Sequence, residues 1–193
     1  MTRRRKAIVA ATAIAALAAA ARYWPLPGAL LDRASQPSTI VLDRHGRTLY
    51  EARNGDGLRG DPVDARLLPP HVAGAAIAAE DHRFRRHPGI DPIAVTRAIW
   101  TRLRHGRGEG GSTLTQQVAR LLLDREAGRQ RPRTPAAKLR EALLAWRLEG
   151  RRSKDEILSL YLTLAPYGNQ IAGVRRASLA YFGIEPAQLT PAQ

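Results

Sequence analysis

The amino-acid sequence predicts a mainly α-helical domain that follows a short β-hairpin and a single transmembrane helix at the amino terminus. From residue 69 onward, apolar residues recur at helical spacing between capping residues and glycine or proline stops. Residues 38–53 read as two short strands around a turn, and residues 7–21 contain no charged side chain. The predicted order is therefore one apolar helix, one hairpin and a series of amphipathic helices.

The composition fits one folded domain with an anionic partner. The chain has 193 residues, of which 44% are hydrophobic, enough for one domain with a core. Lysine and arginine outnumber aspartate and glutamate by 31 to 17, which gives a net charge of +14. Such a balance favours nucleic acid, a lipid headgroup surface or a phosphorylated substrate. The chain has no cysteine, which excludes disulfide bonds and thiolate metal sites.

Residues 1–24 are predicted to form a short cytoplasmic tail and a signal-anchor helix. The basic start MTRRRK is followed by the uncharged stretch 7–21. At about 1.5 Å per residue this stretch spans roughly 22 Å, against about 30 Å of hydrocarbon core. Arg22 can extend its guanidinium to the interface, where Tyr23 and Trp24 suit an aromatic belt.

The basic cluster also predicts the orientation of the chain. It indicates a cytoplasmic amino terminus in the cytoplasmic (inner) membrane, with the domain on the periplasmic or extracellular side. A cleaved signal peptide is the alternative, because small residues near Ala19 and Ala21 suit a peptidase. A juxtamembrane linker is predicted over residues 25–37, where four residues discourage regular structure: Pro25, Pro27, Gly28 and Pro37.

Residues 38–193 are predicted to form the main domain. It begins with the hairpin STIVLDRHGRTLYEAR, whose turn falls at DRHG. The helix PPHVAGAAIAAEDHRF opens with proline, which the first helical turn tolerates. The helix DPIAVTRAIWTRLRHG has Asp91 as its N-cap and Gly106 as its stop. Its candidate core residues are Ile93, Ile99, Trp100 and Leu103.

Three more helices follow a predicted flexible loop, GRGEGG, at residues 106–111. STLTQQVARLLL opens with Thr113 and Gln116 spaced as a capping box. KLREALLAWRLEG comes after an arginine- and proline-rich link at residues 125–135. SKDEILSLYLTL opens with a second capping box, and its apolar residues again have helical spacing.

Two glutamates on different helices are the candidate catalytic residues. Glu80 lies near the end of its helix, just before a proline-glycine break, where a carboxylate can face a cleft and act as a base. Glu141 lies three residues after Lys138 on KLREALLAWRLEG. Such a pair can flank a glycosidic centre, one as base and one assisting departure. The alternative is structural: Glu80 forms a surface ion pair with Arg83, and Glu141 forms one with Lys138.

The helix start GSTLTQQ, residues 111–117, is a candidate phosphate site. Helix amino termini bind phosphate through free N–H groups and the helix dipole, and hydroxyl groups add donors. An ordinary capping box that needs no ligand explains the same residues equally well.

Metal and nucleotide motifs are not indicated. His82 and His87 are five residues apart, and no HExxH motif occurs. GRGEGG follows a predicted helix rather than a strand, and no P-loop is present. No nucleic-acid recognition motif accompanies the basic charge either, so nucleic acid is not an expected partner.

Taken together, three ordered motifs resemble family 51 peptidoglycan glycosyltransferases, the transglycosylase domains of class A penicillin-binding proteins. EDHRFRRHPGID resembles the first signature, ED-x-x-F-x-x-H-x-G, and GGSTLTQQVARLLL resembles the second. KLREALLAWRLEGRRSKDEILSLYLTLAPYGNQIAGVRRASLAYFG is similar to the remaining ones. The resemblance covers about residues 38–193, and the hairpin and the APYG form are closest to the 1C type.

The resemblance implies a lysozyme-like helical fold that polymerises lipid II into glycan strands at the outer face of the cytoplasmic membrane. It implies that Glu80 is the general base on the acceptor 4-hydroxyl, with inversion at the donor and departure of undecaprenyl pyrophosphate. Glu141 matches the second essential glutamate, and Lys138 matches a lysine that contacts the pyrophosphate. The other residues that match substrate-site positions are Asp81, His87, Ser112, Thr113, Gln117 and Arg120.

The resemblance also implies cofactors and partners. A divalent cation, Mg or Mn, assists the pyrophosphate in some relatives, although this sequence adds no metal-ligand set. The expected partners are lipid II, the growing glycan strand, the cytoplasmic membrane and other cell-wall synthesis proteins. A missing transpeptidase domain is a further expected partner, since the glycosyltransferase domain is expected to be truncated at its carboxyl end. The alternatives are a lysozyme-like peptidoglycan hydrolase and an inactive fragment of a bifunctional penicillin-binding protein.

Three positions depart from the family pattern. Ala137 stands where an arginine is usual before the lysine, which removes one cation from the expected pyrophosphate site. Arg120 replaces a common lysine, keeping the charge but changing its geometry. Thr163 replaces the usual asparagine of YLN.

Overall fold

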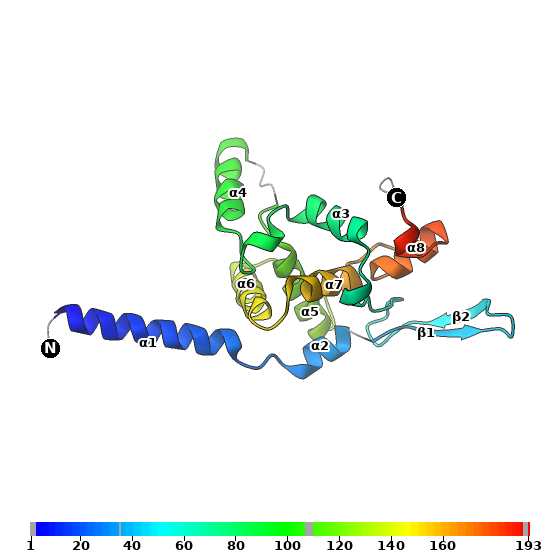
Figure 1. The fold of residues 1–193 in the computed structure, drawn as a ribbon, viewed down its shortest axis with the longest axis horizontal. Helices are drawn as coiled ribbons and strands as arrows, with labels where there is room; N and C mark the ends of the chain where they lie inside the picture. The colour runs from blue at the N-terminus through cyan, green and yellow to red at the C-terminus, as the bar shows by residue number, and fades with distance from the viewer. Residues whose placement is uncertain (1–2, 35, 107–109, 191–192) are drawn as a thin grey trace.

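The computed structural model describes residues 3–34, 36–106, 110–190 and 193, and it is mainly helical (Figure 1). The α-helices are α1 (Arg3–Tyr23), α2 (Gly28–Ala34), α3 (Pro70–Glu80), α4 (Pro92–His105), α5 (Leu114–Glu126), α6 (Pro135–Glu149), α7 (Lys154–Leu164) and α8 (Val174–Phe182). Short 3₁₀ helices lie at Ala65–Leu67, Phe84–Arg86 and Pro186–Gln188. The strands are β1 (Thr39–Leu42) and β2 (Thr48–Ala52).

The predicted hairpin is confirmed. β1 and β2 pair antiparallel, with Ile40 opposite Glu51 and Val41 opposite Tyr50. The turn between them is held by Asp43, whose carboxylate accepts two backbone N–H groups at 2.8 and 2.9 Å. The hairpin extends away from the helical body in Figure 1.

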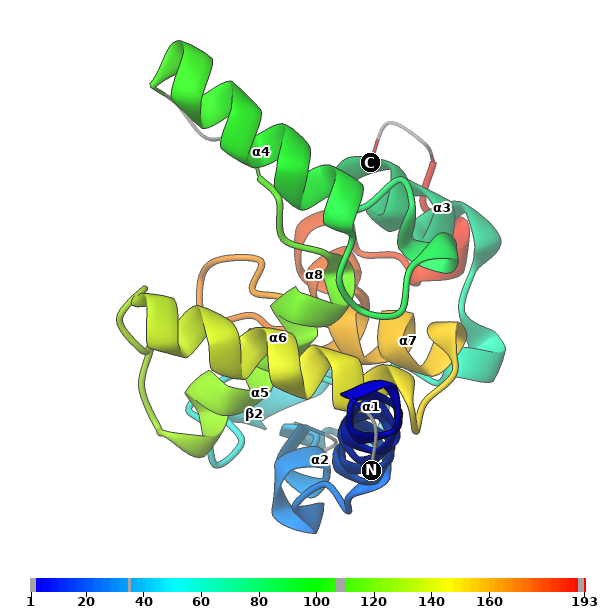
Figure 2. The same ribbon diagram turned by 90° about the vertical axis from the view of Figure 1, so that its left-hand side faces the viewer.

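The hydrophobic core lies where α5 packs against both α6 and α7 (Figure 2). Leu114, Val118 and Leu122 follow one another at intervals of four on α5, and all three are fully or almost fully buried. Their neighbours across the core come from α6 and α7: Leu144, Ala145, Leu148, Ile157, Leu158 and Leu162. Because this packing fixes the start of α5, it also fixes the motif that lies there.

The predicted helix caps are confirmed. Thr113 and Ser153 each open a capping box, and Asp91 accepts the N–H of Ile93 at 2.9 Å. Gly106 ends α4 with a left-handed φ of 67°. In the predicted loop at residues 106–111, residues 107–109 lie outside the described part of the chain.

The predicted core face of α4 is wrong. Its four large apolar side chains are between 55% and 78% exposed: Ile93, Ile99, Trp100 and Leu103. The helix projects from the rest of the domain (Figure 2), so its apolar positions meet no core. Helical periodicity predicts which residues share a face, but it does not say whether another element covers that face.

The predicted transmembrane helix is not supported. Within the described residues, no helix combines the length and the apolarity that a membrane span needs. α1 has 21 residues, but its first turn is basic and its uncharged part is mostly alanine, which is only weakly apolar. The chain just after it is held by α6, where Arg147 donates to the carbonyl groups of Trp24 and Pro25 at 2.9 and 2.8 Å.

The predicted linker at residues 25–37 contains a helix that its prolines did not indicate. Pro25 and Pro27 lie before α2 rather than inside it, and the carbonyl of Pro27 accepts the N–H of Leu30 at 3.1 Å. Leu30 is 7% exposed and belongs to the hydrophobic core, and α2 packs against α5 and α7. This short helix therefore joins the segment before the hairpin to the domain.

Gly89 holds the loop after α3 against α6, and Gly89→Ala is expected to lower the free energy of unfolding by about 2–4 kcal/mol. Its φ is +95°, and a Cβ there would lie 2.9 Å from the carbonyl oxygen of Ala145. The added methyl group must therefore displace the backbone of α6 or of the loop. Denaturant unfolding followed by circular dichroism measures the change.

Gly74→Ala is the matched control for this substitution. Gly74 lies inside α3, and a Cβ there has no neighbour within 4 Å. We expect this variant to be unchanged or more stable by up to about 1 kcal/mol, because alanine is the better helix former. Equal stability losses in the two variants would contradict the role given to Gly89.

Candidate active site

Glu80 is the last residue of α3, and its side chain is exposed where α3 approaches α5. The side-chain amide of Gln117 on α5 donates a hydrogen bond of 2.6 Å to Glu80 Oε2. Arg83, the alternative partner suggested by the sequence, instead forms an ion pair of 3.3 Å with Asp91. The amide of Gln117 therefore orients Glu80. The Glu80 carboxylate lines a cavity and does not form the surface ion pair with Arg83.

The cavity beside Glu80 has a volume of about 580 Å³ and is lined by α3, α5, α7, α8 and the carboxyl-terminal segment. Tyr161 of α7 and Tyr167 of the following loop also line it. Burial raises the pKa of the Tyr161 hydroxyl to about 12, and the charge of Glu80 and a hydrogen bond with it add to the effect. Burial and the same charge raise the pKa of Tyr167. Tyr161 is thus a neutral hydroxyl beside the Glu80 carboxylate.

Tyr161→Phe is expected to remove the tyrosine ionisation near pH 12 from the ultraviolet absorbance titration of the folded protein. An unfolded tyrosine ionises near pH 10, so the folded state binds this proton more tightly. The corresponding stability is complete below about pH 10 and is lost as the pH rises towards 12. Circular dichroism at each pH shows where the protein stays folded, and an unchanged titration of the variant would contradict the assignment.

Asp81 and His87 form a buried pair next to Glu80, at the carboxyl end of α3. They are 8% and 4% exposed, and His87 Nε2 lies 2.9 Å from Asp81 Oδ2. The same Asp81 oxygen accepts the backbone N–H of Leu114, the first residue of α5, at 3.0 Å. This pair therefore joins the end of α3, where Glu80 lies, to the start of α5.

Thr113 and Ser112 have different surroundings, although they are adjacent. Thr113 is 2% exposed, caps α5 and donates a hydrogen bond of 2.6 Å to the carbonyl of Gly89. The Ser112 hydroxyl accepts a hydrogen bond of 2.8 Å from Lys138 Nζ on α6. The structure thus places Thr113 in the framework and Ser112 beside a cation.

Lys138 and Glu141 lie on one face of α6, as their spacing predicted. Lys138 Nζ is 3.2 Å from Glu141 Oε2, and Glu141 is 8% exposed. Arg131, from the loop before α6, approaches the other oxygen, with Nη2 at 4.0 Å from Glu141 Oε1. Glu141 is therefore a mostly buried carboxylate between two cations.

α5 links the two groups of residues. Gln117, which holds Glu80, and Arg120 are one turn apart on this helix. Arg120 pairs with Asp124 at 3.5 Å, and Asp124 also binds Arg131, the neighbour of Glu141. A carboxylate with free access to a cavity thus lies on one side of α5, and a cluster of cations lies further along it.

Thr163, the departure from the family pattern on α7, has a structural contact. Its hydroxyl accepts the backbone N–H of Val63 at 2.9 Å, and the residue is 8% exposed. The side chain therefore fastens the segment after the hairpin to α7.

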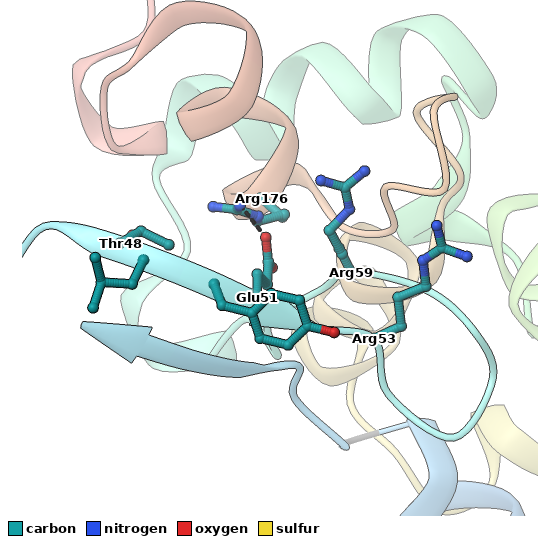
Figure 3. Close-up of a pocket in the computed structure, with 7 residues that line it drawn as sticks. Thr48, Glu51, Arg53, Arg59 and Arg176 are labelled. Atoms are coloured by element: carbon teal, nitrogen blue, oxygen red, sulfur yellow. Dashed lines mark hydrogen bonds and ion pairs between the residues drawn. The ribbon is translucent and has the colours of Figure 1, made fainter. Parts of the chain in front are cut away.

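A second cavity, of about 660 Å³, lies between β2 and α8 and contains none of the predicted site residues. Figure 3 shows Glu51 and Arg176 directed at each other across it, and they form an ion pair. Arg53 and Arg59 complete its basic lining. The ion pair joins the hairpin to α8. The carboxylate in this cavity, that of Glu51, is less exposed than that of Glu80.

The residues described do not form a metal site. Across the described ranges, no group of three or more histidine, aspartate or glutamate side chains is placed to hold a metal ion. The expected Mg or Mn therefore stays a prediction.

Sequence reasoning missed Tyr161, Tyr167 and Arg131 as site residues. Tyr161 has the spacing of a core residue on α7, and Arg131 lies in a stretch that reads as a link. The tyrosine of APYG, inside a motif, was a signal that could have indicated Tyr167. The positions of the other two depend on contacts between distant segments.

Comparison with known proteins identifies the class to which this fold and site belong. A sequence model of the transglycosylase family matches residues 45–193. The chain therefore belongs to the transglycosylase family, as its motifs predicted, and its domain is that of a glycosyltransferase enzyme.

Three relatives show which members of the family the chain is similar to. Penicillin-binding protein 1C of Escherichia coli (strain K12) is 41% identical over 170 residues, which are 88% of this chain and 21% of that protein. Penicillin-binding protein 1A of Aquifex aeolicus is 44% identical over 123 residues, 63% of this chain and 16% of that protein. The biosynthetic peptidoglycan transglycosylase of Nitrosospira multiformis is 35% identical over 158 residues, 81% of this chain and 66% of that protein. The chain thus spans about a fifth of the length of the penicillin-binding proteins that it matches.

Proposed function

We propose that this domain polymerises lipid II into glycan strands, with Glu80 as the general base. The observation that carries the proposal is the Glu80 carboxylate, held by Gln117 at the edge of a cavity of about 580 Å³. The Lys138–Glu141 pair lies on α6, which packs against α5. A base and a separate group of cations are what an inverting transfer with an anionic leaving group needs.

In the proposed reaction, Glu80 takes the proton of the acceptor sugar's 4-hydroxyl. The freed oxygen attacks the anomeric carbon of the donor, a new glycosidic bond forms, and the bond to the pyrophosphate oxygen breaks. The electron pair leaves with undecaprenyl pyrophosphate, and the configuration at the anomeric carbon inverts. The amide of Gln117 supports this role because it hydrogen-bonds to the carboxylate and orients it, and the neutral hydroxyl of Tyr161 lies beside it.

Lys138 and Arg120 are proposed to stabilise the charge that grows on the pyrophosphate. Both carry a positive charge, and Lys138 is 49% exposed in its side chain, so it can reach a ligand. The Ser112 hydroxyl, which now accepts a hydrogen bond from Lys138, is a further phosphate contact. Because pyrophosphate is a good leaving group, cations are sufficient and no strong general acid is required.

The exposed face of α4 supports a lipid-linked substrate and a membrane setting. Ile93, Ile99, Trp100 and Leu103 are exposed, and Arg97 and Arg102 lie on the same helix. Such a helix suits the interface of an anionic membrane, where the apolar face enters and the cations meet headgroups. We infer that the domain acts at the outer face of the cytoplasmic membrane.

The partners proposed for the domain follow from this reaction. They are lipid II, the growing glycan strand and other cell-wall synthesis proteins. A transpeptidase domain is proposed as a further partner, and the relatives that support it are named penicillin-binding proteins.

The test is incubation of the purified chain with labelled lipid II in detergent, followed by gel separation of the glycan products. Polymer that lysozyme digests is the expected result. Release of reducing ends from finished peptidoglycan, with lipid II unused, would instead establish a hydrolase. If only a form extended at its carboxyl end makes polymer, the chain is an inactive fragment, and if that form is also inert the proposal fails.

A further inference from the structure

Arg131 is a partly buried cation in the loop between α5 and α6, outside every motif in the sequence. Its side chain is 15% exposed, and its Nε is 3.1 Å from Asp124 Oδ1. The same oxygen of Asp124 accepts the backbone N–H of Arg131 at 3.0 Å. Two hydrogen bonds from one residue to one carboxylate therefore fix both the backbone and the guanidinium of Arg131.

The far end of this guanidinium faces Glu141. Arg131 Nη2 is buried and has no hydrogen-bond partner among the described residues, although it is 4.0 Å from Glu141 Oε1. Burying an unpartnered charged donor is costly, so a structure keeps one only where something offsets it. The Glu141 carboxylate, 8% exposed, lies within ion-pair distance of this nitrogen.

The two cations beside Glu141 differ in their freedom. The Lys138 side chain is 49% exposed and shares its ammonium between Ser112 and Glu141 Oε2, at 2.8 and 3.2 Å. Arg131 is pinned by Asp124 and cannot follow a ligand. If Lys138 turns towards an anionic leaving group, Glu141 loses one cation and keeps only Arg131. Ala137, just before Lys138, supplies no further charge.

We propose that Arg131 is a positioning residue, which holds Glu141 by Oε1 so that Lys138 is free to move to the departing pyrophosphate. This inference rests on the function proposed above. The planar guanidinium is required because its Nε must meet Asp124 while its Nη2 meets Glu141. A lysine ammonium donates from one nitrogen, so it does not reproduce the separate positions of Nε and Nη2.

The test compares Arg131→Met and Arg131→Lys with Arg129→Met, a control at an exposed arginine of the same loop. In lipid II polymerisation we expect Arg131→Met to lower kcat by about 10- to 100-fold, with KM within about threefold of the parent. Arg131→Lys should recover little of this loss, and Arg129→Met should stay within about twofold of the parent.

A double-substitution cycle with Glu141→Gln shows whether Arg131 acts through Glu141. In the Glu141→Gln background, Arg131→Met is expected to change kcat by less than about twofold. The same cycle applied to Tm needs no activity: the combined loss should be smaller than the sum of the single losses. Equal fold-losses in both backgrounds, or additive losses in Tm, would overturn the inference.

Failure of the inference can be told apart from failure of the proposed function. If wild type polymerises lipid II and Arg131→Met matches it, only the role of Arg131 is lost. If neither the wild type nor its extended form polymerises lipid II, the proposed function fails. The Tm cycle then still decides whether Arg131 and Glu141 are coupled.

Discussion

Glu80→Gln is expected to reduce the rate of lipid II polymerisation by about 10²- to 10⁴-fold, the usual contribution of a general base. Glutamine has almost the same shape and can still bind Gln117, but it cannot take the proton of the acceptor hydroxyl. Since the Glu80 side chain is exposed, its replacement leaves the core intact. We therefore expect an unchanged Tm and an unchanged affinity for lipid II.

The measurement is single-turnover polymerisation of labelled lipid II, with lipid II binding and Tm recorded on the same preparations. Glu126→Gln is the matched control, because Glu126 is an exposed glutamate at the far end of α5. It should keep the parent rate. A Glu80→Gln variant that polymerises at the parent rate would remove Glu80 from its proposed role, whatever the other site residues do.

Asp81→Ala is expected to have the largest effect on stability, a loss of about 3–5 kcal/mol in the free energy of unfolding. The carboxylate accepts the backbone N–H of Leu114 at 3.0 Å and lies 2.9 Å from His87 Nε2. Its removal leaves both donors buried. His87 Nδ1 is already buried without a hydrogen-bond partner among the described residues. Without Asp81, neither ring nitrogen of His87 would keep a hydrogen bond shown by the structure.

Denaturant unfolding measures this loss, and two further variants define its cause. Asp81→Asn keeps one oxygen for the N–H of Leu114, so we expect a smaller loss, of about 1–3 kcal/mol. Asp155→Ala removes an aspartate whose ion pair with Arg85 is more than half exposed, and it should lose less than about 1 kcal/mol. If Asp81→Ala also loses less than about 1 kcal/mol, the pair of Asp81 and His87 does not hold α3 against α5.

The fold could be predicted where the signal is local. Capping boxes at Thr113 and Ser153, the N-cap Asp91 and the glycine stop at Gly106 depend on neighbouring residues, and each was found as predicted. The face of α4 was wrong because exposure depends on what packs against a helix. The helix α2 was missed because prolines before a helix and prolines within a loop look alike in sequence.

The candidate site could be predicted only in part. The motifs picked out Glu80, Gln117, Lys138 and Glu141, and the structure brings them together in two contacting pairs, Glu80 with Gln117 and Lys138 with Glu141. No local pattern indicates that Arg83 pairs with Asp91 and that Glu80 binds Gln117 instead. Which carboxylate an arginine pairs with depends on how the segments pack, because a long arginine side chain can reach several partners.

By itself, the sequence determined the helical class, the caps, the hairpin and the family, because each depends on the order and spacing of neighbouring residues. Only the tertiary structure decided which polar side chains meet: Asp81 with His87, Arg131 with Asp124 and Glu141, and Tyr161 with Glu80. These contacts join residues from different helices and loops. They arise when the core of α5, α6 and α7 closes and sets the distances between those segments.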